Sequence, residues 1–327
     1  MRKALSLLLT LAACASPPAT SPPPAASAPP AAPGLPGEAP KKAPIEVAIT
    51  VDDLPVHGRS FTGIDRMKIA DDFLAAFRAH RLPPVYGFVN GEKVDKDPAT
   101  RAILRRWIDA GNPLGNHTYG HVSLNELEVP AYLADLEKGE DILKQLVPDE
   151  SVWKVYRYPF LFEGTTLEKR DAVRHYLAEH HYAIAPVTID GDDWAWNPPF
   201  ARCQEIHDLP ALRELRRGYI ETHLSELRFI RELTRKIAGR EVKQILLLHI
   251  GAADADALEE LLTAYEKEGV RWIDLPTALA DPFYAIDPHL AMKAGAALPY
   301  RLAKAKGVSA APFPQRPAED ALEQSCR

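Results

Sequence analysis

Two adjacent carboxylates, Asp52 and Asp53, follow an apolar stretch that begins at Ile45. An apolar run of this length, stopped by Pro55, predicts a buried strand whose last residues emerge into a site. Neighbouring side chains on an extended strand point in different directions. One carboxylate can therefore bind a cation while the other faces a substrate or a water molecule. The alternative is a turn or a helix N-cap, where aspartate is common.

Two histidines, His117 and His121, form the second pattern, with Gly115 and Gly120 around them. Histidines four positions apart can share one face of a helical turn and hold one ion. Two neutral imidazoles and one carboxylate, for which Asp53 is the candidate, make a metal site with positions open for water and substrate. The alternative is a pair of surface or core histidines that bind nothing.

Strands and helices alternate along the chain, which predicts an α/β fold with a parallel sheet. About seven such units allow the sheet to close into a barrel. The expected strands are residues 45–51, 85–89, 113–116, 152–158, 182–189, 242–249 and 270–273. The expected helices are residues 64–80, 97–110, 130–146, 167–180, 209–237 and 255–268.

Reactive polar side chains stand at or just after the C-terminal ends of five of these strands. In barrels and in open α/β sheets, that edge carries the active site. We therefore expect these side chains to meet at one edge of the sheet. Taken alone, a lone histidine is usually a core residue and an Arg–Asp pair can be a structural ion pair. The residues are Asp52 with Asp53, His117, Arg157, Asp193 and His249.

Together these residues resemble the motifs of the polysaccharide deacetylases, carbohydrate esterases of the NodB-homology type. The motifs occur in the family's order and span roughly residues 45–282. The chain departs from the usual pattern at Val51, Leu54 and Tyr158, which alters the walls of the groove and leaves the substrate open. The matching segments are Thr50-Val51-Asp52-Asp53, His117-Thr118-Tyr119-Gly120-His121, Arg157-Tyr158-Pro159-Phe160, Asp190-Gly191-Asp192-Asp193-Trp194 and Leu247-Leu248-His249.

The resemblance implies a distorted (β/α) barrel of about seven parallel strands. It also implies one divalent metal ion, Zn²⁺ in first place and Co²⁺, Ni²⁺ or Mn²⁺ as other options. Asp53, His117 and His121 would hold that ion. The reaction would be hydrolysis of N-acetyl groups on a glycan that contains N-acetylglucosamine.

The resemblance assigns roles to the other site residues as well. Asp52 would take a proton from water as general base, and His249 would protonate the departing amine. Arg157 would hold Asp52 and lower its pKa, while Asp193 would support Arg157 or orient His249. The remaining two are Phe160, whose backbone N–H would face the oxyanion, and Trp194, which would pack against the substrate site.

The N-terminus has the pattern of a bacterial lipoprotein. A basic start, an apolar stretch and the box that ends at Cys14 predict a signal peptide over residues 1–14, with Cys14 lipidated. The alternative is an ordinary secretory peptide. Residues 15–44 are rich in Pro, Ala and Ser and predict a disordered tether. We expect a catalytic domain over residues 45–285 and a loosely held extension over residues 286–327.

These predictions place the protein on the periplasmic side of the bacterial envelope, lipid-anchored at the outer membrane. A net charge of −6 offers no basic surface for nucleic acid. Cys203 and Cys326 either pair in that oxidising compartment or remain free thiols. The segment 197–242 forms either a lid or an outer-layer helix, and His57 either lines the groove or sits in a surface loop.

The leading hypothesis is a metal-dependent deacetylase that acts on an N-acetylated glycan. One alternative is a non-catalytic glycan-binding lipoprotein on the same scaffold, although such a module has no use for both a base and an acid. Another is a metal-dependent hydrolase of a different non-peptide C–N bond. Acetate release from a substrate panel separates the three.

Overall fold

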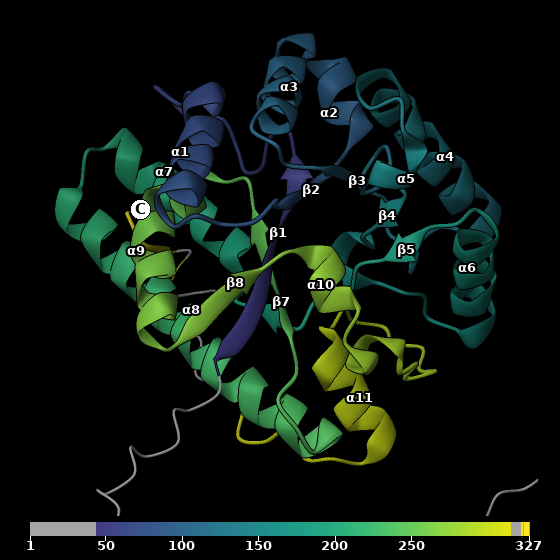
Figure 1. The fold of residues 1–327 in the computed structure, drawn as a ribbon. Helices are drawn as coiled ribbons and strands as arrows, with labels where there is room; N and C mark the ends of the chain where they lie inside the picture. The colour runs from purple at the N-terminus through teal and green to yellow at the C-terminus, as the bar shows by residue number, and fades with distance from the viewer. Residues whose placement is uncertain (1–43, 315–321, 323, 327) are drawn as a thin grey trace, which may run out of the picture. The chain divides into compact units, whose positions relative to one another are not determined.

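One curled sheet of parallel strands forms the centre of the molecule (Figure 1). The computed structural model describes residues 44–314, 322 and 324–326, so the expected signal peptide with Cys14 and nearly all of the expected tether lie outside the described residues. The sheet order is β5-β4-β3-β2-β1-β7-β6, and β8 also pairs with β1. The strands are β1 (Ile45–Leu54), β2 (Tyr86–Val89), β3 (Leu114–Asn116), β4 (Val155–Tyr156), β5 (Ala183–Ile184), β6 (Ile189–Asp190), β7 (Gln244–His249) and β8 (Val270–Ile273).

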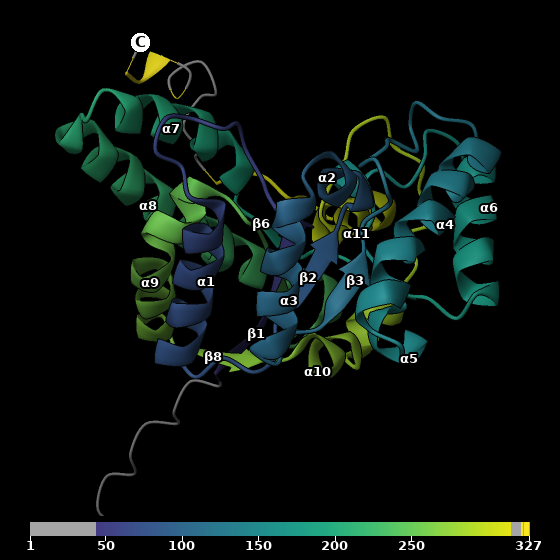
Figure 2. The same ribbon diagram turned by 90° about the horizontal axis from the view of Figure 1, so that it is seen from above.

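Helices surround this sheet, which makes the fold a distorted (β/α) barrel, as expected. In both views α1, α7, α8 and α9 lie on one side and α4, α5 and α6 on the other (Figures 1 and 2). The helices are α1 (Arg66–Ala79), α2 (Gly91–Lys96), α3 (Arg101–Asp109), α4 (Val129–Leu146), α5 (Glu150–Trp153), α6 (Leu167–Glu179), α7 (Asn197–Glu205), α8 (Leu209–Ala238), α9 (Ala252–Lys267), α10 (Leu275–Leu279) and α11 (Leu298–Lys306).

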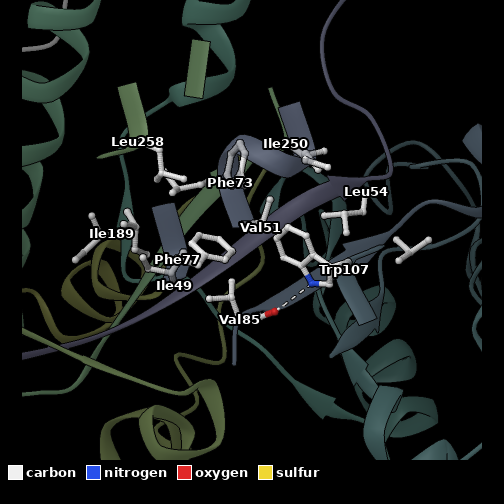
Figure 3. Packing of buried hydrophobic residues seen from close by; sticks show 14 of the residues in the cluster. Ile49, Val51, Leu54, Phe73, Phe77, Val85, Trp107, Ile189, Ile250 and Leu258 are labelled. Carbon is white, nitrogen blue, oxygen red and sulfur yellow. Dashed lines mark hydrogen bonds between the residues drawn. The ribbon is translucent and has the colours of Figure 1, made fainter. Parts of the chain in front are cut away.

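The central strand β1 is apolar because it is covered on both faces, as parallel strands usually are. Every residue of β1 except Glu46 is buried. Phe73 and Phe77 of α1 and Trp107 of α3 pack beside it (Figure 3). The ring centroids of Phe73 and Phe77 are 5.9 Å apart, and those of Phe77 and Trp107 are 5.6 Å apart. The indole N–H of Trp107 donates to the carbonyl of Val85, 3.2 Å away, so this large ring is buried with its polar atom satisfied.

Two of the expected strands are much shorter in the structure than in the prediction. Only β4 forms within residues 152–158, because residues 150–153 make the short helix α5. Residues 182–189 supply β5 and the start of β6, which lie at opposite ends of the sheet. The barrel is therefore open between these two strands.

The C-terminal extension fills that opening. Leu298 N donates to Val187 O at 2.8 Å, and Arg301 forms two hydrogen bonds with Glu163, one of them 2.9 Å long. Leu302 of α11 is 1% exposed. The expectation of a loosely held extension is therefore wrong for α11. Its buried apolar side chains are spaced at helical intervals within a stretch that is otherwise rich in alanine, lysine and proline.

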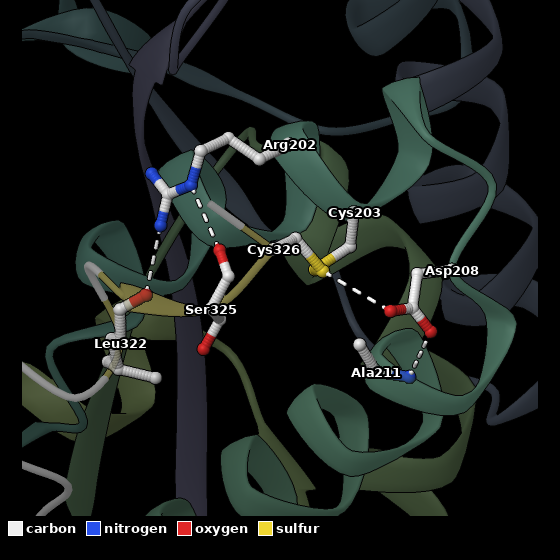
Figure 4. The surroundings of a disulfide bond; sticks show 7 residues. All are labelled: Arg202, Cys203, Asp208, Ala211, Leu322, Ser325 and Cys326. Atoms are coloured by element: carbon white, nitrogen blue, oxygen red, sulfur yellow. Dashed lines mark hydrogen bonds between the residues drawn. A yellow bond between two sulfur atoms is a disulfide. The ribbon is translucent and has the colours of Figure 1, made fainter.

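Helix α8 belongs to the outer layer, where it packs on α7 and α9. It forms most of the segment 197–242, for which the sequence allowed either a lid or an outer-layer helix. A disulfide joins Cys203 of α7 to Cys326, and Arg202 donates to the carbonyls of Leu322 and Ser325 beside it (Figure 4). The open choice between paired and free thiols is thus settled as a pair. Across the described part of the chain, no helix has both the length and the apolar character needed to span a membrane.

Candidate active site and metal centre

A bulge in β1 brings both carboxylates into one site. Asp52 lies opposite His249 in the register between β1 and β7. The pairing of β1 with β2 shifts between Val51 and Leu54, and Asp53 adopts a left-handed backbone with φ 70°. A bulge of this kind re-aims a side chain next to a functional site. The two neighbouring carboxylates can therefore face the same cavity instead of opposite faces of the sheet.

That cavity has a volume of about 320 Å³ and opens at the C-terminal edge of the sheet. It contains seven of the site residues predicted from the sequence. Arg157 and Asp193 do not line it; they contact residues that do. The lining residues are Asp52, Asp53, His57, His117, His121, Tyr158, Phe160, Leu161, Asp190, Trp194, Leu247 and His249.

Three of the lining residues make a candidate metal centre. Asp53 Oδ1 lies 3.4 Å from His121 Nε2 and 3.9 Å from His117 Nε2, and one ligand atom of each lies within 4.8 Å of the others. The two histidines come from an irregular loop, so the expectation that they share a helical turn is wrong. Left-handed residues at Thr118 (φ 64°) and His121 (φ 53°) turn both rings to the same side.

Hydrogen bonding fixes the tautomer of His117. Its Nδ1 lies 2.8 Å from the carbonyl of Arg157. A carbonyl only accepts, so Nδ1 carries the proton and Nε2 keeps its lone pair toward Asp53. This is the arrangement in which a backbone carbonyl orients a metal-binding imidazole.

The charge states of this triad also suit a cation. Burial lowers the pKa of His117 well below its usual value and that of His121 to about 4, so both imidazoles are neutral at pH 7. Burial alone would raise the pKa of Asp53, but the Lys93 ammonium and the His57 hydrogen bond hold it well below its usual value. Metal ligands must be in these deprotonated states.

Two buried oxygens support the same assignment. Oδ1 of Asp52 and Oδ1 of Asp53 accept no well-directed hydrogen bond from the described residues, although Lys93 Nζ lies 3.0 Å from the latter. A buried carboxylate oxygen without such a bond is costly unless something else satisfies it. Two neutral imidazoles and one carboxylate fit a divalent ion such as Zn²⁺.

His57 also belongs to the site. Its Nδ1 lies 2.7 Å from Asp53 Oδ2, and its ring lies 4.7 Å from that of His249. Asp53, His57 and His249 form a second candidate group, in which one ligand atom of each residue lies within 4.8 Å of the others. The only signal in the sequence was its position four residues after Asp53.

Asp52, the candidate base, lies beside the metal centre. His117 Nε2 is 3.6 Å from its Oδ2, and Arg157 Nη1 approaches the same oxygen at 3.4 Å. Burial raises the pKa of Asp52 to about 6, and the opposing effect of Arg157 is smaller. The expected contact with Arg157 is present, but the expected net lowering of the pKa is wrong. A carboxylate with a pKa close to neutrality is well matched to general base work at pH 7.

Asp193 orients His249, and it forms no hydrogen bond or ion pair with Arg157 in the described part of the chain. Asp193 Oδ1 lies 2.7 Å from His249 Nδ1, and its Oδ2 accepts from the backbone N–H of His249 at 2.5 Å. A carboxylate at Nδ1 holds the proton there and leaves Nε2 for the cavity. Arg157 is held instead by Ala185 O at 2.7 Å and Thr50 Oγ1 at 2.9 Å.

A second buried carboxylate, Asp254, lies behind this pair and was missed by sequence reasoning. It is hydrogen-bonded to Asp193 and accepts from Tyr219 OH and Asn197 Nδ2, each at 2.9 Å. Burial is the largest cause that raises the pKa of both carboxyl groups, that of Asp193 to about 7. Asp254 lies in the first turn of α9 and belongs to none of the motifs recognised in the sequence.

Two exposed aromatic rings stand at the mouth of the cavity. Phe160, with a left-handed backbone (φ 56°), is 51% exposed and packs edge-on against His121 at 4.4 Å. Trp194 is 44% exposed, whereas Trp196 is buried against Tyr219. Trp194 therefore offers a face to a ligand and Trp196 belongs to the core.

Comparisons with known proteins identify similar sequences. Residues 39–182 match the family model for polysaccharide deacetylases. The chain is 28% identical over 149 residues to a peptidoglycan-N-acetylglucosamine deacetylase of Bacillus cereus, which covers 46% of each chain. The chain thus spans about half the length of this curated relative.

Three solved structures are also similar. A polysaccharide deacetylase from Bacillus cereus has a TM-score of 0.49 at 16% identity, covering 71% of this chain and 92% of that one. A peptidoglycan deacetylase from Bacillus subtilis has a TM-score of 0.46 at 18% identity, covering 72% and 90%. A CE4 family pseudoenzyme from Bacillus anthracis has a TM-score of 0.47 at 16% identity, covering 72% and 66%.

Proposed function

We propose that the chain is a polysaccharide deacetylase, which removes N-acetyl groups from an N-acetylated glycan by metal-dependent hydrolysis. One observation carries the proposal. A neutral histidine pair and the ionised Asp53 stand beside a second carboxylate, Asp52, while His249 faces the same cavity. This supplies cation ligands, a base and an acid within a single cavity.

Asp53, His117 and His121 would hold the ion, with Zn²⁺ as our first choice. When bound, such an ion polarises the acyl carbonyl and makes a water molecule more acidic. Asp52 then accepts a proton from the attacking water, and Arg157 keeps its carboxylate in place at 3.4 Å. The water oxygen bonds to the acyl carbon as the C–N bond breaks.

The departing nitrogen needs a proton, and His249 is placed to supply it. Asp193 fixes its Nδ1 and stabilises the charged imidazole, so that the proton leaves from Nε2. The backbone N–H of Phe160 is our candidate donor to the oxyanion. The reaction consumes one water molecule, and its products are acetate and a free amine on the sugar.

The test is acetate release from N-acetylglucosamine oligomers by the purified protein, with and without a chelator. Asp52→Asn should lower kcat by about 10²- to 10⁴-fold, the usual contribution of a general base. His117→Ala should lower metal content and activity together. Asp72→Asn is the matched control, because Asp72 is an exposed carboxylate on α1.

Activity that survives both Asp52→Asn and complete chelation would contradict the proposal. Bound metal with no turnover on any acylated substrate would instead favour a glycan-binding lipoprotein on this scaffold. Turnover confined to non-glycan amides would favour a hydrolase of another C–N bond.

We also propose that Cys14 is lipidated and that the protein works on the periplasmic side of the cell envelope, at the outer membrane. The support is the signal-peptide pattern that ends at Cys14. Metabolic labelling with an alkyne fatty acid should mark the wild-type protein and not Cys14→Ser. Equal labelling of the two proteins would refute this anchor.

A further inference from the structure

Two buried carboxyl groups, Asp193 and Asp254, lie behind the imidazole of His249. Both are 0% exposed, neither lines the catalytic cavity, and they are hydrogen-bonded to each other. The strands β6 and β7 that precede them are paired, with Asp193 in the turn after β6 and Asp254 in the first turn of α9 after β7. The topology of the sheet therefore brings the two carboxyl groups together on the side of His249 that faces away from the cavity.

Asp193 is fixed to His249 at two points. Its Oδ1 lies 2.7 Å from Nδ1 of His249, and its Oδ2 accepts from the backbone N–H of the same residue at 2.5 Å. This role suits the ionised carboxylate, which has acceptor positions only. In its hydrogen bond with Asp254, Asp193 is then the acceptor, and the proton of that bond belongs to Asp254.

Asp254 is held in place by two neutral donors. The hydroxyl of Tyr219 donates to its Oδ1 and the amide of Asn197 to its Oδ2, each at 2.9 Å. The amide of Asn197 has a defined orientation, because its oxygen accepts from the backbone N–H of Ala253 at 3.0 Å. No lysine or arginine in the described part of the chain forms an ion pair with Asp254. A neutral carboxylic acid fits these partners better than a second buried charge beside Asp193.

The charge balance of the pair leads to the same assignment. Burial has the largest effect on Asp254 and raises its pKa well above the usual value, and the neighbouring Asp193 raises it further. Burial also raises the pKa of Asp193 to about 7, and the hydrogen bond from Asp254 is the largest effect that opposes this rise. Asp254 therefore favours the ionised form of Asp193, which stabilises a positive charge on His249.

The turn between His249 and Asp254 is shaped around the same contact. A Cβ atom at Gly251 would lie 2.4 Å from Oδ2 of Asp254 and 2.4 Å from both amide atoms of Asn197. Only glycine lets the backbone pass this close to a polar contact. The backbone thus fixes the place of Asp254 relative to His249 together with the hydrogen bonds.

We propose that Asp254 is a positioning residue for the reaction, which keeps its own proton, donates a hydrogen bond to Asp193, and through Asp193 orients His249. The inference rests on the proposed function, since it concerns the acid of that reaction. Asp254 gives up no proton during turnover. The proton that reaches the departing nitrogen comes from Nε2 of His249, while Asp254 keeps Asp193 ionised and aligned.

Two substitutions at Asp254 separate its hydrogen bonds from its volume. Asp254→Leu removes the hydrogen bonds and should lower kcat about tenfold, because one bond to a charged group is lost. KM for N-acetylglucosamine oligomers and the content of bound Zn²⁺ should stay at the wild-type values, since Asp254 does not line the cavity. Asp254→Asn is neutral and keeps a donor for Asp193, so it should restore kcat to within about threefold of wild type. Glu259→Gln is the control, at an exposed position of the same helix.

Infrared spectroscopy tests the proton on Asp254 directly and requires neither turnover nor the leucine variant. A neutral carboxylic acid and an ionised carboxylate absorb at different frequencies. The difference spectrum between wild type and Asp254→Asn at pH 7 should show the loss of a carboxylic acid band. The loss of a carboxylate band would overturn the inference. Equal losses of kcat in Asp254→Asn and Asp254→Leu, or an unchanged kcat in Asp254→Leu, would overturn it as well.

The outcomes also distinguish this inference from the proposed function. Absence of acetate release from every glycan, with a carboxylic acid band that Asp254→Asn removes, would refute the reaction and support the hydrogen-bonded pair. Acetate release by the wild-type protein that Asp254→Leu leaves unchanged would support the reaction and refute the positioning role.

Discussion

Replacing His57 by phenylalanine should weaken Zn²⁺ binding without removing a ligand. His57 Nδ1 lies 2.7 Å from Asp53 Oδ2, and the opposite oxygen of Asp53 faces His117 and His121. His57 therefore holds the carboxylate in the orientation that the ion requires. Phenylalanine keeps the ring that packs on His249 and removes only the donor.

The magnitude follows from the burial and charge of this hydrogen bond. The side chains of His57 and Asp53 are 16% and 9% exposed. A hydrogen bond to a charged group contributes about 1.5–3 kcal/mol, which corresponds to roughly 10- to 150-fold in a dissociation constant. Loss of a hydrogen-bond partner behind a metal ligand costs about 10- to 100-fold in affinity. We therefore expect the Kd for Zn²⁺ to rise by about 10- to 100-fold.

The assay is competition for Zn²⁺ against a chromophoric chelator at fixed pH, which needs no turnover. His175→Phe is the control, because His175 is 73% exposed on α6. A Kd within twofold of wild type would refute the positioning role. A rise above about 10³-fold, matching that of His117→Ala, would equally refute it, because it would make His57 a ligand.

Three further predictions concern charge and packing. Lys93→Met removes an ammonium 3.0 Å from Asp53 Oδ1 and should tighten Zn²⁺ binding about tenfold, since it removes a repelling charge; unchanged or weaker binding in the same competition assay would contradict this. Leu302→Ala should cost about 3 kcal/mol of unfolding free energy, because the side chain is 1% exposed, whereas Lys304→Ala on the exposed side of α11 should cost almost nothing; equal unfolding midpoints in denaturant would contradict a packed extension. Asp281→Asn should lower the free energy of unfolding by about 2 kcal/mol at pH 7. Burial alone would raise the pKa of Asp281, but hydrogen bonds from Arg240 and two backbone N–H groups lower it to about 2. Because the folded pKa lies below the unfolded value of 3.8, the wild-type advantage is complete above about pH 4 and disappears as the pH falls toward 2; a difference between the two proteins that persists at pH 2 would contradict the sign.

Much of the scaffold could be predicted because its elements carry simple patterns. The buried run in β1 and the strand over residues 270–273 are short apolar segments, and α8 shows a helical repeat of apolar residues over most of its length. The meeting of Asp52, His117 and His249 was predictable for a geometric reason. The C-terminal ends of parallel strands lie at the same edge of a sheet.

Other parts of the site depend on contacts that no local pattern encodes. His57 reaches Asp53 only because the chain turns back after β1, and Asp254 reaches Asp193 from the first turn of α9. The loop from His117 to His121 was predicted as a helical turn because the spacing fits one. Left-handed backbone at Thr118 and His121 produced the same convergence without a helix.

The pKa of Asp52 was predicted in the wrong direction for a related reason. A sequence shows that an arginine is available, but it does not show how deeply the carboxylate is buried. Arg157 approaches at 3.4 Å, yet burial has the larger effect and raises the pKa to about 6. The packing of the C-terminal extension was hidden in the same way, because its buried leucines are few and stand in a stretch that is otherwise rich in alanine, lysine and proline.

The most direct test of the account is the position of the bound ion. Crystals of the Zn²⁺-loaded protein should give an anomalous peak at the zinc edge about 2.0–2.2 Å from a carboxylate oxygen of Asp53 and from Nε2 of His117 and His121. His57 should lie outside this coordination shell, and Asp52 should lie next to the shell. A peak held by Asp53, His57 and His249, or no peak in the cavity, would contradict the account.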